Sequence, residues 1–329
     1  MISDRHRLAL AAASLALIVT TDSASAQDWP TRPVTMVVPF AAGGPLDALG
    51  RILAPRLGEI LGQQVVVENI TGAGGMIGSS RVAKAAPDGY QFLLGHTGTL
   101  AYNQTLYKRP AYNSITDFAP VSLISEGSYA LITRKDFPAN DLAEFVAYAK
   151  ANEAKLQYGS GGAGANSHIA CVMLNTAMGT RITHVPYRGS GPALQDLMGG
   201  RIDFTCEPLT TAVAQIQNGT VKPIAILSPR RSTALPDLAT ANEQGLADID
   251  VDTWIAFCLP KGTPDPIIRR LNTATSETLD TPSVRQRFES VGQRIVAPER
   301  RGPDYLVKLV PSEVAKWAGP IKASGVSID

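Results

Sequence analysis

The 329-residue sequence predicts an α/β protein with two lobes, each a mostly parallel sheet flanked by helices. Three observations support this prediction. Strand-like and helix-like segments alternate along almost the entire chain. The length favours two domains, and a composition with 44% hydrophobic and 18% charged residues is that of an ordinary globular protein. Three glycine-rich loops each lie between a predicted strand and a predicted helix, as βα units require.

The first βα unit shows the pattern most clearly. An apolar run ends at the loop Phe40–Pro45, and leucine and isoleucine then recur at helical spacing as far as Leu57. Pro45 suits the first helical position, where an N–H group is not needed. Gly43 and Gly44 let the backbone come close to a ligand, and the N–H groups of the first helical turn point unpaired at that space. No lysine or arginine lies in this loop, so a small anion there would be held by peptide dipoles.

The later elements follow in order, separated by turn residues such as Pro87-Asp88-Gly89. The predicted strands, marked by short apolar runs, are residues 64–68, 91–95, 121–124, 130–133, 156–158, 182–185, 202–206, 223–227 and 253–259. The predicted helices, marked by helical spacing of apolar residues, are residues 72–85, 141–152, 166–178, 191–198, 210–217, 266–279, 283–291 and 304–324. Asn166 or Ser167 is expected to cap the third of these helices, and residues 96–99 are expected to form a polar loop.

The glycine-rich loops 40–45, 72–75 and 159–164 all lie at the carboxyl ends of predicted strands, where ligands of such folds bind. If two sheets face each other, the loops converge on one cleft. No flexible linker or internal repeat is visible, so we expect the chain to cross between lobes along strands, near residues 121–130 and 222–229. The predicted lobes are residues 27–124 together with 228–329, and residues 125–227.

Residues 1–26 have the features of a secretory signal peptide. Basic residues at Arg5–Arg7 precede the apolar core Leu8–Thr20, and Ala24–Ala26 gives a cleavage site before Gln27. The apolar core is short for a spanning helix, although an N-terminal membrane anchor is the alternative. The sequence therefore predicts an exported, soluble protein, with the bacterial periplasm as its compartment.

Charge and cysteine content argue against several classes of function. The net charge is +1 without long charged runs, so neither nucleic acid nor an anionic membrane surface is an expected partner. The three cysteines, Cys171, Cys206 and Cys258, are widely spaced in apolar surroundings. They allow at most one intramolecular disulfide, and buried free thiols are the expectation. No C-x-x-C motif is present to support structural zinc or thioredoxin chemistry.

The loop Gly159–Gly164 matches G-x-G-x-x-G after a predicted strand. The next strand ends in Pro186-Tyr187-Arg188 without the acid that binds a ribose, and Ala165-Asn166 stands where a P-loop has Lys and Ser or Thr. We therefore expect no nucleotide cofactor. The motif favours an anion site made by backbone groups at a helix N-terminus, with a plain tight turn as the alternative.

The sequence shows no complete catalytic or metal-binding set. Neither G-x-S-x-G nor S-x-x-K occurs, and Ser160 near His168 lacks an orienting acid. His96, His168 and His184 share no metal-ligand spacing. Asp47 lies in a first helical turn, where a carboxylate stabilises the helix dipole; contact with an amine or hydroxyl of a ligand is the alternative. We therefore expect neither catalysis nor a metal.

Together these motifs resemble one family, the extracytoplasmic solute receptors of tripartite tricarboxylate transporters, also called the Bug family. The matching pieces cover nearly the whole mature chain in order. They are Trp29-Pro30-x-x-Pro33-Val34, Pro39-Phe40-Ala41-Ala42-Gly43-Gly44-x-x-Asp47, Val67-Glu68-Asn69-x-x-Gly72-Ala73-Gly74-Gly75-x-Ile77-Gly78, Pro87-Asp88-Gly89-Tyr90, His184-Val185-Pro186-Tyr187-Arg188-Gly189, Gly199-Gly200-Arg201-Ile202-Asp203, Arg231-Ser232-x-x-Leu235-Pro236-Asp237 and Gly262-Thr263-Pro264.

The resemblance implies a type II-like periplasmic binding protein, a Venus flytrap that closes on a small organic carboxylate. It further implies a monomer that delivers its ligand to an ion-driven permease of one large and one small subunit. The loops Phe40–Asp47 and Ser160–His168 would hold the carboxylate, partly through ordered water. The ligand-binding residues that the resemblance implies are Phe40, Ala42, Gly43, Gly44, Leu46, Asp47, Thr97, Thr99, Ser160, Gly161, Ala163, Gly164, Asn166, Ser167, His168, Tyr187, Asp203 and Glu207.

The sequence departs from the family pattern at two places that bear on the ligand. Pro45-Leu46 replaces a small residue and a threonine, and Cys206-Glu207 stands where a Phe-Asp-like pair is common. We therefore expect a mono- or dicarboxylate with an apolar or aromatic body. Two other roles stay open. The protein could dock on a signalling receptor, or it could be an exported enzyme, which would need a nucleophile–base pair that the sequence does not show.

Overall fold

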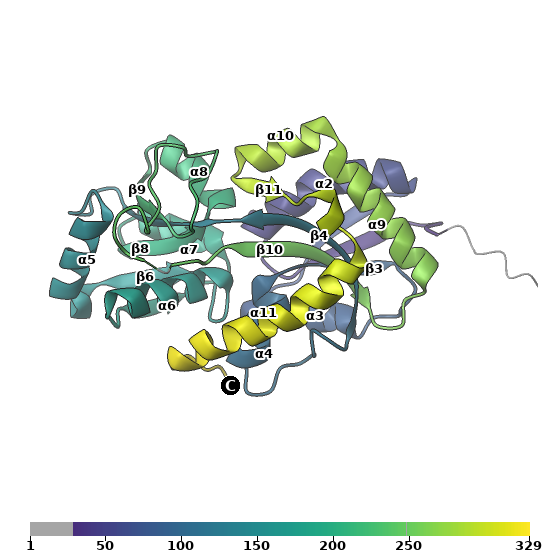
Figure 1. Ribbon diagram of the computed structural model, residues 1–329, viewed down its shortest axis with the longest axis horizontal. Helices are drawn as coiled ribbons and strands as arrows, with labels where there is room; N and C mark the ends of the chain where they lie inside the picture. Colours follow the sequence, from purple (N-terminus) through teal and green to yellow (C-terminus); the bar gives the residue numbers. More distant parts are fainter. Residues whose placement is uncertain (1–28, 248) are drawn as a thin grey trace, which may run out of the picture.

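The computed structural model describes residues 29–247 and 249–329. They form two mixed sheets, each with helices on both faces (Figure 1). This confirms the predicted α/β class with two lobes. The predicted signal peptide, residues 1–26, lies outside the described residues. Within the described ranges, no helix is both long and apolar enough to cross a membrane.

The first sheet has the strand order β11-β4-β10-β3-β1-β2. Its strands are β1 (Val34–Val38), β2 (Val65–Asn69), β3 (Gln91–His96), β4 (Phe118–Gly127), β10 (Thr253–Pro260) and β11 (Gln293–Ile295). One apolar core joins this sheet to α2 (Pro45–Leu61), α9 (Asp265–Asp280) and α10 (Pro282–Ser290). A second core, on the other face, joins it to α3 (Met76–Ala83), α4 (Asn103–Leu106) and α11 (Pro303–Ala323). Short helical turns are η1 (Ala73–Gly75), η2 (Gly98–Tyr102) and η4 (Pro298–Arg300).

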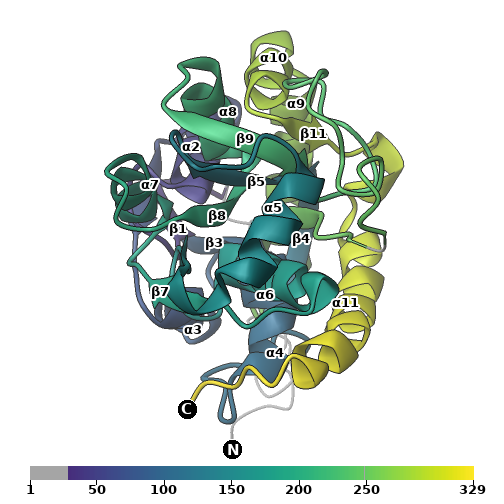
Figure 2. The same ribbon diagram turned by 90° about the vertical axis from the view of Figure 1, so that its left-hand side faces the viewer.

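The second sheet has the order β7-β6-β8-β5-β9. Its strands are β5 (Tyr129–Arg134), β6 (Gln157–Ser160), β7 (Thr183–Pro186), β8 (Phe204–Pro208) and β9 (Val221–Ile226). The helices α5 (Leu142–Ala151) and α6 (Asn166–Met178) pack on one face, and η3 (Glu153–Lys155) follows α5. The helices α7 (Ser190–Met198) and α8 (Leu209–Gln217) pack on the other face, as Figure 2 shows.

Both sheets are mixed, which corrects the expectation of mostly parallel sheets. Parallel pairing holds for β2-β1-β3 and for β7-β6-β8. The strand β4 continues through Ser128 into β5 and so carries the chain into the second lobe, and β10 brings it back. A leaving strand and a returning strand run in opposite directions, so β10 pairs antiparallel with β4. In the second sheet, β5 pairs antiparallel with both its neighbours, β8 and β9.

The segment that follows β9 bears on where the chain returns to the first lobe. The core of the second sheet includes Ala241, Ile249 and Val251, and Ile226 pairs with Thr240 in an isolated bridge. The segment after β9 therefore packs on the second sheet. We accordingly propose that the second lobe extends to about residue 251 and that the chain returns along β10.

Three local expectations need correction. Ala165 is the N-cap residue of α6, and Asn166 and Ser167 are its first helical residues. Residues 96–99 were expected to form a polar loop, but a turn of π-helix begins at Gly98 and continues to Tyr102. Cys171 and Cys206 form a disulfide, with Cα atoms 5.4 Å apart, because α6 packs over β8. The expectation of free thiols was wrong for this pair, since sequence spacing does not show that packing.

Candidate functional site

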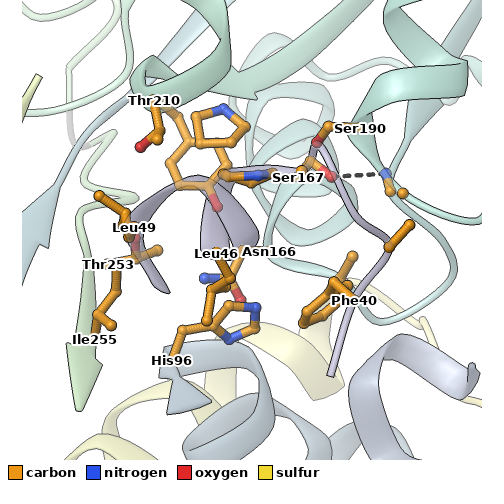
Figure 3. Close-up of a pocket in the computed structure, with 18 of the residues that line it drawn as sticks. Phe40, Leu46, Leu49, His96, Asn166, Ser167, Ser190, Thr210, Thr253 and Ile255 are labelled. Atoms are coloured by element: carbon orange, nitrogen blue, oxygen red, sulfur yellow. Dashed lines mark hydrogen bonds between the residues drawn. The ribbon is translucent and has the colours of Figure 1, made fainter. Parts of the chain in front are cut away.

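A cavity of about 50 Å³ lies between the two sheets (Figure 3). Both lobes contribute to it. From the first lobe come Phe40, Ala41, Gly44, Pro45, Leu46, Leu49, His96, Thr253, Ile255 and Gln293. From the second lobe come Tyr129, Gly161, Ala165, Asn166, Ser167, Gly189, Ser190, Pro208 and Thr210. A ligand held here would contact both lobes at once.

The N-terminal ends of four described helices, α2, α6, α7 and α8, border the cavity. Each contributes residues from its N-cap or first turn, such as Gly44 for α2, Ser167 for α6, Ser190 for α7 and Thr210 for α8. Among the described residues, no side chain caps any of these four helices. The Leu209 N–H of α8 donates to the Ser128 carbonyl. The positive ends of the four helix dipoles nevertheless meet at the cavity without side-chain caps, an arrangement that favours an anion.

Asn166 offers the most available side chain in the cavity. It is only 4% exposed, yet neither its Oδ1 nor its Nδ2 has a hydrogen-bond partner among the described residues. A buried amide without a partner is costly, typically by about 1–3 kcal/mol. The side chain packs over Gly98 of the first lobe, where a Cβ atom would collide with its Oδ1. Asn166 can therefore hydrogen-bond a ligand between the lobes.

Asp47 organises the first glycine loop from behind the cavity. Its Oδ2 accepts hydrogen bonds from the Gly43 N–H and from Nε of Arg51, both at 2.9 Å. Burial opposes ionisation, but these bonds hold the pKa of the Asp47 carboxyl below its usual value. The carboxylate is thus directed at Gly43 and Arg51, and Asp47 does not line the cavity.

The first-lobe wall of the cavity is largely apolar, and its polar side chains are those of His96, Thr253 and Gln293. Leu46, Leu49 and Ile255 are almost fully buried there. His96 accepts the Thr99 N–H at Nδ1, and burial lowers its pKa to about 4, so the imidazole is neutral at pH 7. No lysine or arginine among the described residues lines the cavity. An anion here would be held by peptide dipoles, as the sequence of the first loop indicates, with its body against an apolar wall.

The predicted site residues separate into two groups. Those that line the cavity are Phe40, Gly44, Leu46, Gly161, Asn166 and Ser167. Those that lie outside its lining are Ala42, Gly43, Asp47, Thr97, Thr99, Ser160, Ala163, Gly164, His168, Tyr187, Asp203 and Glu207.

Several residues of the second group are engaged within their own lobe. The Thr97 hydroxyl accepts the Trp254 N–H at 2.8 Å, and the Thr99 hydroxyl accepts the His96 N–H. Asp203 pairs with Arg134 and accepts the Gln157 N–H. The Tyr187 hydroxyl donates to Asp196.

Tyr187 and Ala163 line a neighbouring hollow of about 530 Å³, which shares Phe40 and Gly161 with the cavity. These two predicted residues therefore line the adjacent hollow and not the cavity.

Ser160 pairs with a different histidine from the one expected. Its Oγ lies 2.6 Å from Nε2 of His184, whereas Nδ1 of His168 accepts the Gly164 N–H. The two imidazoles stack with centroids 4.0 Å apart, and burial lowers their pKa values to about 3 for His168 and about 4 for His184. Ser160 is fully buried. In the described part of the chain, no cluster of His, Cys, Asp or Glu could hold a metal.

The cavity also includes residues that the sequence did not indicate, in particular Gln293. Its Oε1 accepts the Ser125 hydroxyl at 2.9 Å, and its Nε2 donates to Thr210 at 3.1 Å. Gln293 belongs to the first sheet and Thr210 to α8, so the second bond joins the two lobes at the cavity wall. Gly127 leaves room for this side chain, because a Cβ atom there would collide with the Gln293 amide.

Five further lining residues that were not predicted are of two kinds. Ser190, Pro208 and Thr210 lie at helix starts after predicted strands, a signal that could have indicated them. Thr253 and Ile255 lie on the returning strand β10, and no local signal connects that strand with the glycine loops.

The two-lobed α/β fold and a cavity between the lobes define a protein of the periplasmic binding-protein class, and the comparisons identify the family. Residues 49–326 match the model of the tripartite tricarboxylate transporter family receptor. The chain is 42% identical over 303 residues to the "UPF0065 protein in the TAR-I ttuE-ttuC' intergenic region" of Agrobacterium vitis. The aligned region covers 92% of this chain and 87% of that protein.

Two solved structures are similar to the whole fold. MatC from Rhodopseudomonas palustris with bound malate is 40% identical, with a TM-score of 0.86, covering 88% of this chain and 99% of that one. An R. palustris protein with adipate is 34% identical, also with a TM-score of 0.86, covering 91% and 99%. The chain therefore belongs to the tripartite tricarboxylate transporter receptor family, a family of solute-binding receptors, and the predicted resemblance is confirmed.

Proposed function

We propose that this protein captures a small organic carboxylate between its two lobes and delivers it to a tripartite permease of one large and one small subunit. The permease would be driven by an ion gradient. The observation that carries the proposal is the set of four uncapped helix N-termini around a cavity whose described lining has no lysine or arginine. Such a site favours reversible capture of an anion by peptide dipoles.

The apolar first-lobe wall supports a ligand with an apolar or aromatic body. A carboxylate at the helix N-termini would place the rest of the molecule against Leu46, Leu49 and Ile255. The similar structures contain malate and adipate, both dicarboxylates, and adipate has an apolar chain between its carboxylates. We propose that the contacts come from Phe40, Gly44, Leu46, Gly161, Asn166 and Ser167.

Delivery would depend on the closed arrangement of the lobes. A ligand that contacts both lobes binds the closed state better than the open state, and so shifts the population toward closure. The Gln293–Thr210 hydrogen bond adds to this preference because it joins the lobes. A permease that recognises the closed form would then take up only loaded receptor. We propose that the protein acts as a periplasmic monomer after export by residues 1–26.

A thermal-shift screen of the mature chain, from Gln27, would test the proposed function. The protein would first be unfolded and refolded to remove carried-over ligand, then mixed with adipate, benzoate, phthalate, malate, citrate and amino acids. Because a ligand that binds only the folded state must stabilise it, we expect the Tm to rise most with adipate or an aromatic acid. No rise with any acid would count against the receptor function, and tight binding of citrate alone would contradict the apolar preference.

The variant Asn166→Ala tests the site itself. Loss of a hydrogen bond to a charged ligand should weaken binding of the best carboxylate about tenfold or more. Asn218→Ala, an exposed position at the end of α8, is the matched control and should bind like the wild type.

A further inference from the structure

Glu207 is a fully buried acid behind the cavity. It lies on β8 directly before Pro208, which lines the cavity, and its side chain meets Thr211 in the first turn of α8. The hydroxyls of Ser190, at the start of α7, and of Thr205 lie near the carboxyl group without forming a hydrogen bond to it. Glu207 therefore lies next to two of the helix N-termini that face the cavity, without lining the cavity itself.

The hydrogen bonds around Glu207 fit a protonated carboxyl better than an ionised one. Oγ1 of Thr211 lies 2.5 Å from Glu207 Oε1 and 3.1 Å from the Pro208 carbonyl oxygen. The single proton of the Thr211 hydroxyl cannot serve both acceptors fully. If Glu207 carries a proton, it donates to Thr211, and the Thr211 hydroxyl donates to the Pro208 carbonyl.

The second carboxyl oxygen leads to the same conclusion. Oε2 of Glu207 is buried and has no hydrogen-bond partner among the described residues. An ionised carboxylate in that position would be a fully buried negative charge without a salt-bridge partner among the described residues, which is more costly than a neutral acid. Burial accordingly raises the pKa of the Glu207 carboxyl to about 7, although the neighbouring hydroxyls oppose the shift.

We propose that the cavity takes up an organic carboxylate together with one proton, and that Glu207 holds this proton. The inference rests on the proposed function, capture of a carboxylate. Each helix N-terminus offers roughly half a positive charge to the cavity. An ionised Glu207 beside α7 and α8 would cancel much of that charge and repel the ligand. A protonated Glu207 leaves the dipoles free for the ligand, so the bound anion favours proton uptake.

We expect Glu207, and not the charged groups near it, to change its protonation around neutral pH. The helix α8 contains no titratable side chain. On α7, Asp196 is paired with Arg201, and on β5, Arg134 is paired with Asp203. Tyr129 of β5 and Tyr158 of β6 lie on the strands that pair with β8, and burial raises the pKa of each well above 10.

The histidines in the described residues do not titrate near pH 7 either. Burial lowers the pKa of His96 and of His184 to about 4, and that of His168 to about 3. A change in ligand affinity between about pH 6 and pH 9 would therefore report on Glu207.

Titration calorimetry with adipate and benzoate tests the proposal, because their own carboxylates stay ionised over this range. For a one-proton linkage, affinity should be constant below about pH 6.5 and fall by up to tenfold per pH unit above pH 7. Measurements near pH 8 in buffers of different ionisation enthalpy should show uptake of about one proton per carboxylate bound. This second readout uses the wild-type protein alone, so it holds even if variants at Glu207 do not fold.

The variant Glu207→Gln keeps a donor toward Thr211 but cannot ionise. It should bind adipate at about pH 9 as tightly as the wild type does at about pH 6, with no proton uptake. Glu277→Gln, an exposed change on α9, is the matched control and should keep the wild-type pH profile.

Two negative results are distinguishable. Binding of adipate or benzoate with unchanged affinity across this pH range and no proton uptake would overturn the role of Glu207 and leave the receptor function intact. No binding of any carboxylate at any pH would overturn the receptor function itself.

Discussion

The two walls of the cleft differ in what they can recognise. The second-lobe wall carries three of the helix N-termini and the amide of Asn166, which has no hydrogen-bond partner among the described residues, and the buried acid Glu207 lies behind it. The first-lobe wall carries one helix N-terminus and the apolar side chains of Leu46, Leu49 and Ile255. We therefore propose a division of labour, in which the second lobe selects for negative charge and the first lobe selects the body of the ligand.

The lobes should also differ in their sensitivity to acid. The second lobe contains the stacked pair His168 and His184, and the first lobe contains His96; burial lowers the pKa of all three from 6.5 to about 3 or 4. Because the folded state binds fewer protons than the unfolded state, stability is complete above about pH 6.5 and is lost as the pH falls toward 4. We expect a loss of several kcal/mol over this range, measured by urea denaturation at each pH.

The contributions of the two lobes to the loss of stability in acid can be separated with variants that preserve the hydrogen bonds of these histidines. His168→Asn with His184→Gln should flatten most of the acid-induced loss, and His96→Asn should flatten a smaller part. If the double variant lost stability in acid as steeply as the wild type, the histidine stack would not be the acid-sensitive feature of the second lobe.

A negative charge at the second-lobe wall should abolish anion recognition. Asn166→Asp changes one atom and places a carboxylate in the first turn of α6, facing the cavity. Repulsion between the introduced carboxylate and the carboxylate of adipate, in a buried site, should weaken adipate binding about 100-fold or more at pH 7. Calorimetry would measure this change in affinity. Asn218→Asp adds the same charge at an exposed position and should change affinity less than twofold. An equally small effect of Asn166→Asp would show that a bound anion does not face this side chain.

A change in the first-lobe wall should alter selectivity more than overall affinity. Leu46→Thr replaces an apolar side chain of the cavity with a hydroxyl of smaller apolar area. We expect the ratio of benzoate affinity to malate affinity to fall about tenfold, the usual effect of one or two methylene groups in an apolar pocket. Val307→Thr, an exposed position on α11, is the control. An equal loss for both acids would assign Leu46 to folding instead of selectivity.

The same two walls explain how much could be predicted from the sequence. The loop before α2 and the loop before α6 have local signals, a strand followed by glycines and a helix start, and both border the cavity. Thr97 and Thr99 also follow a strand. The sequence shows that such polar side chains need a hydrogen bond, but it does not show whether the partner is a ligand in the cavity or a group of the same lobe. Their partners are backbone groups of the first lobe.

Long-range packing accounts for the rest. Ile255 and Gln293 reach the cavity because β10 and β11 each pair with β4 in the first sheet, although both strands lie far along the chain from the glycine loops. The Cys171–Cys206 disulfide likewise depends on how α6 lies over β8. No spacing or local pattern determines either arrangement, so a single sequence could not indicate them.

The smallest expected effect concerns the contact that joins the two walls. Gln293→Leu keeps the volume but removes the hydrogen bonds to Thr210 and Ser125. Losing one bond that exists only in the closed state should cost about 1 kcal/mol of closure, and so weaken every carboxylate about three- to tenfold without changing their order. Small-angle scattering with and without adipate would measure closure, and Gln217→Leu on the surface of α8 is the control. A change in the order of ligands would mean that Gln293 also selects the ligand, and that the division of labour between the walls is incomplete.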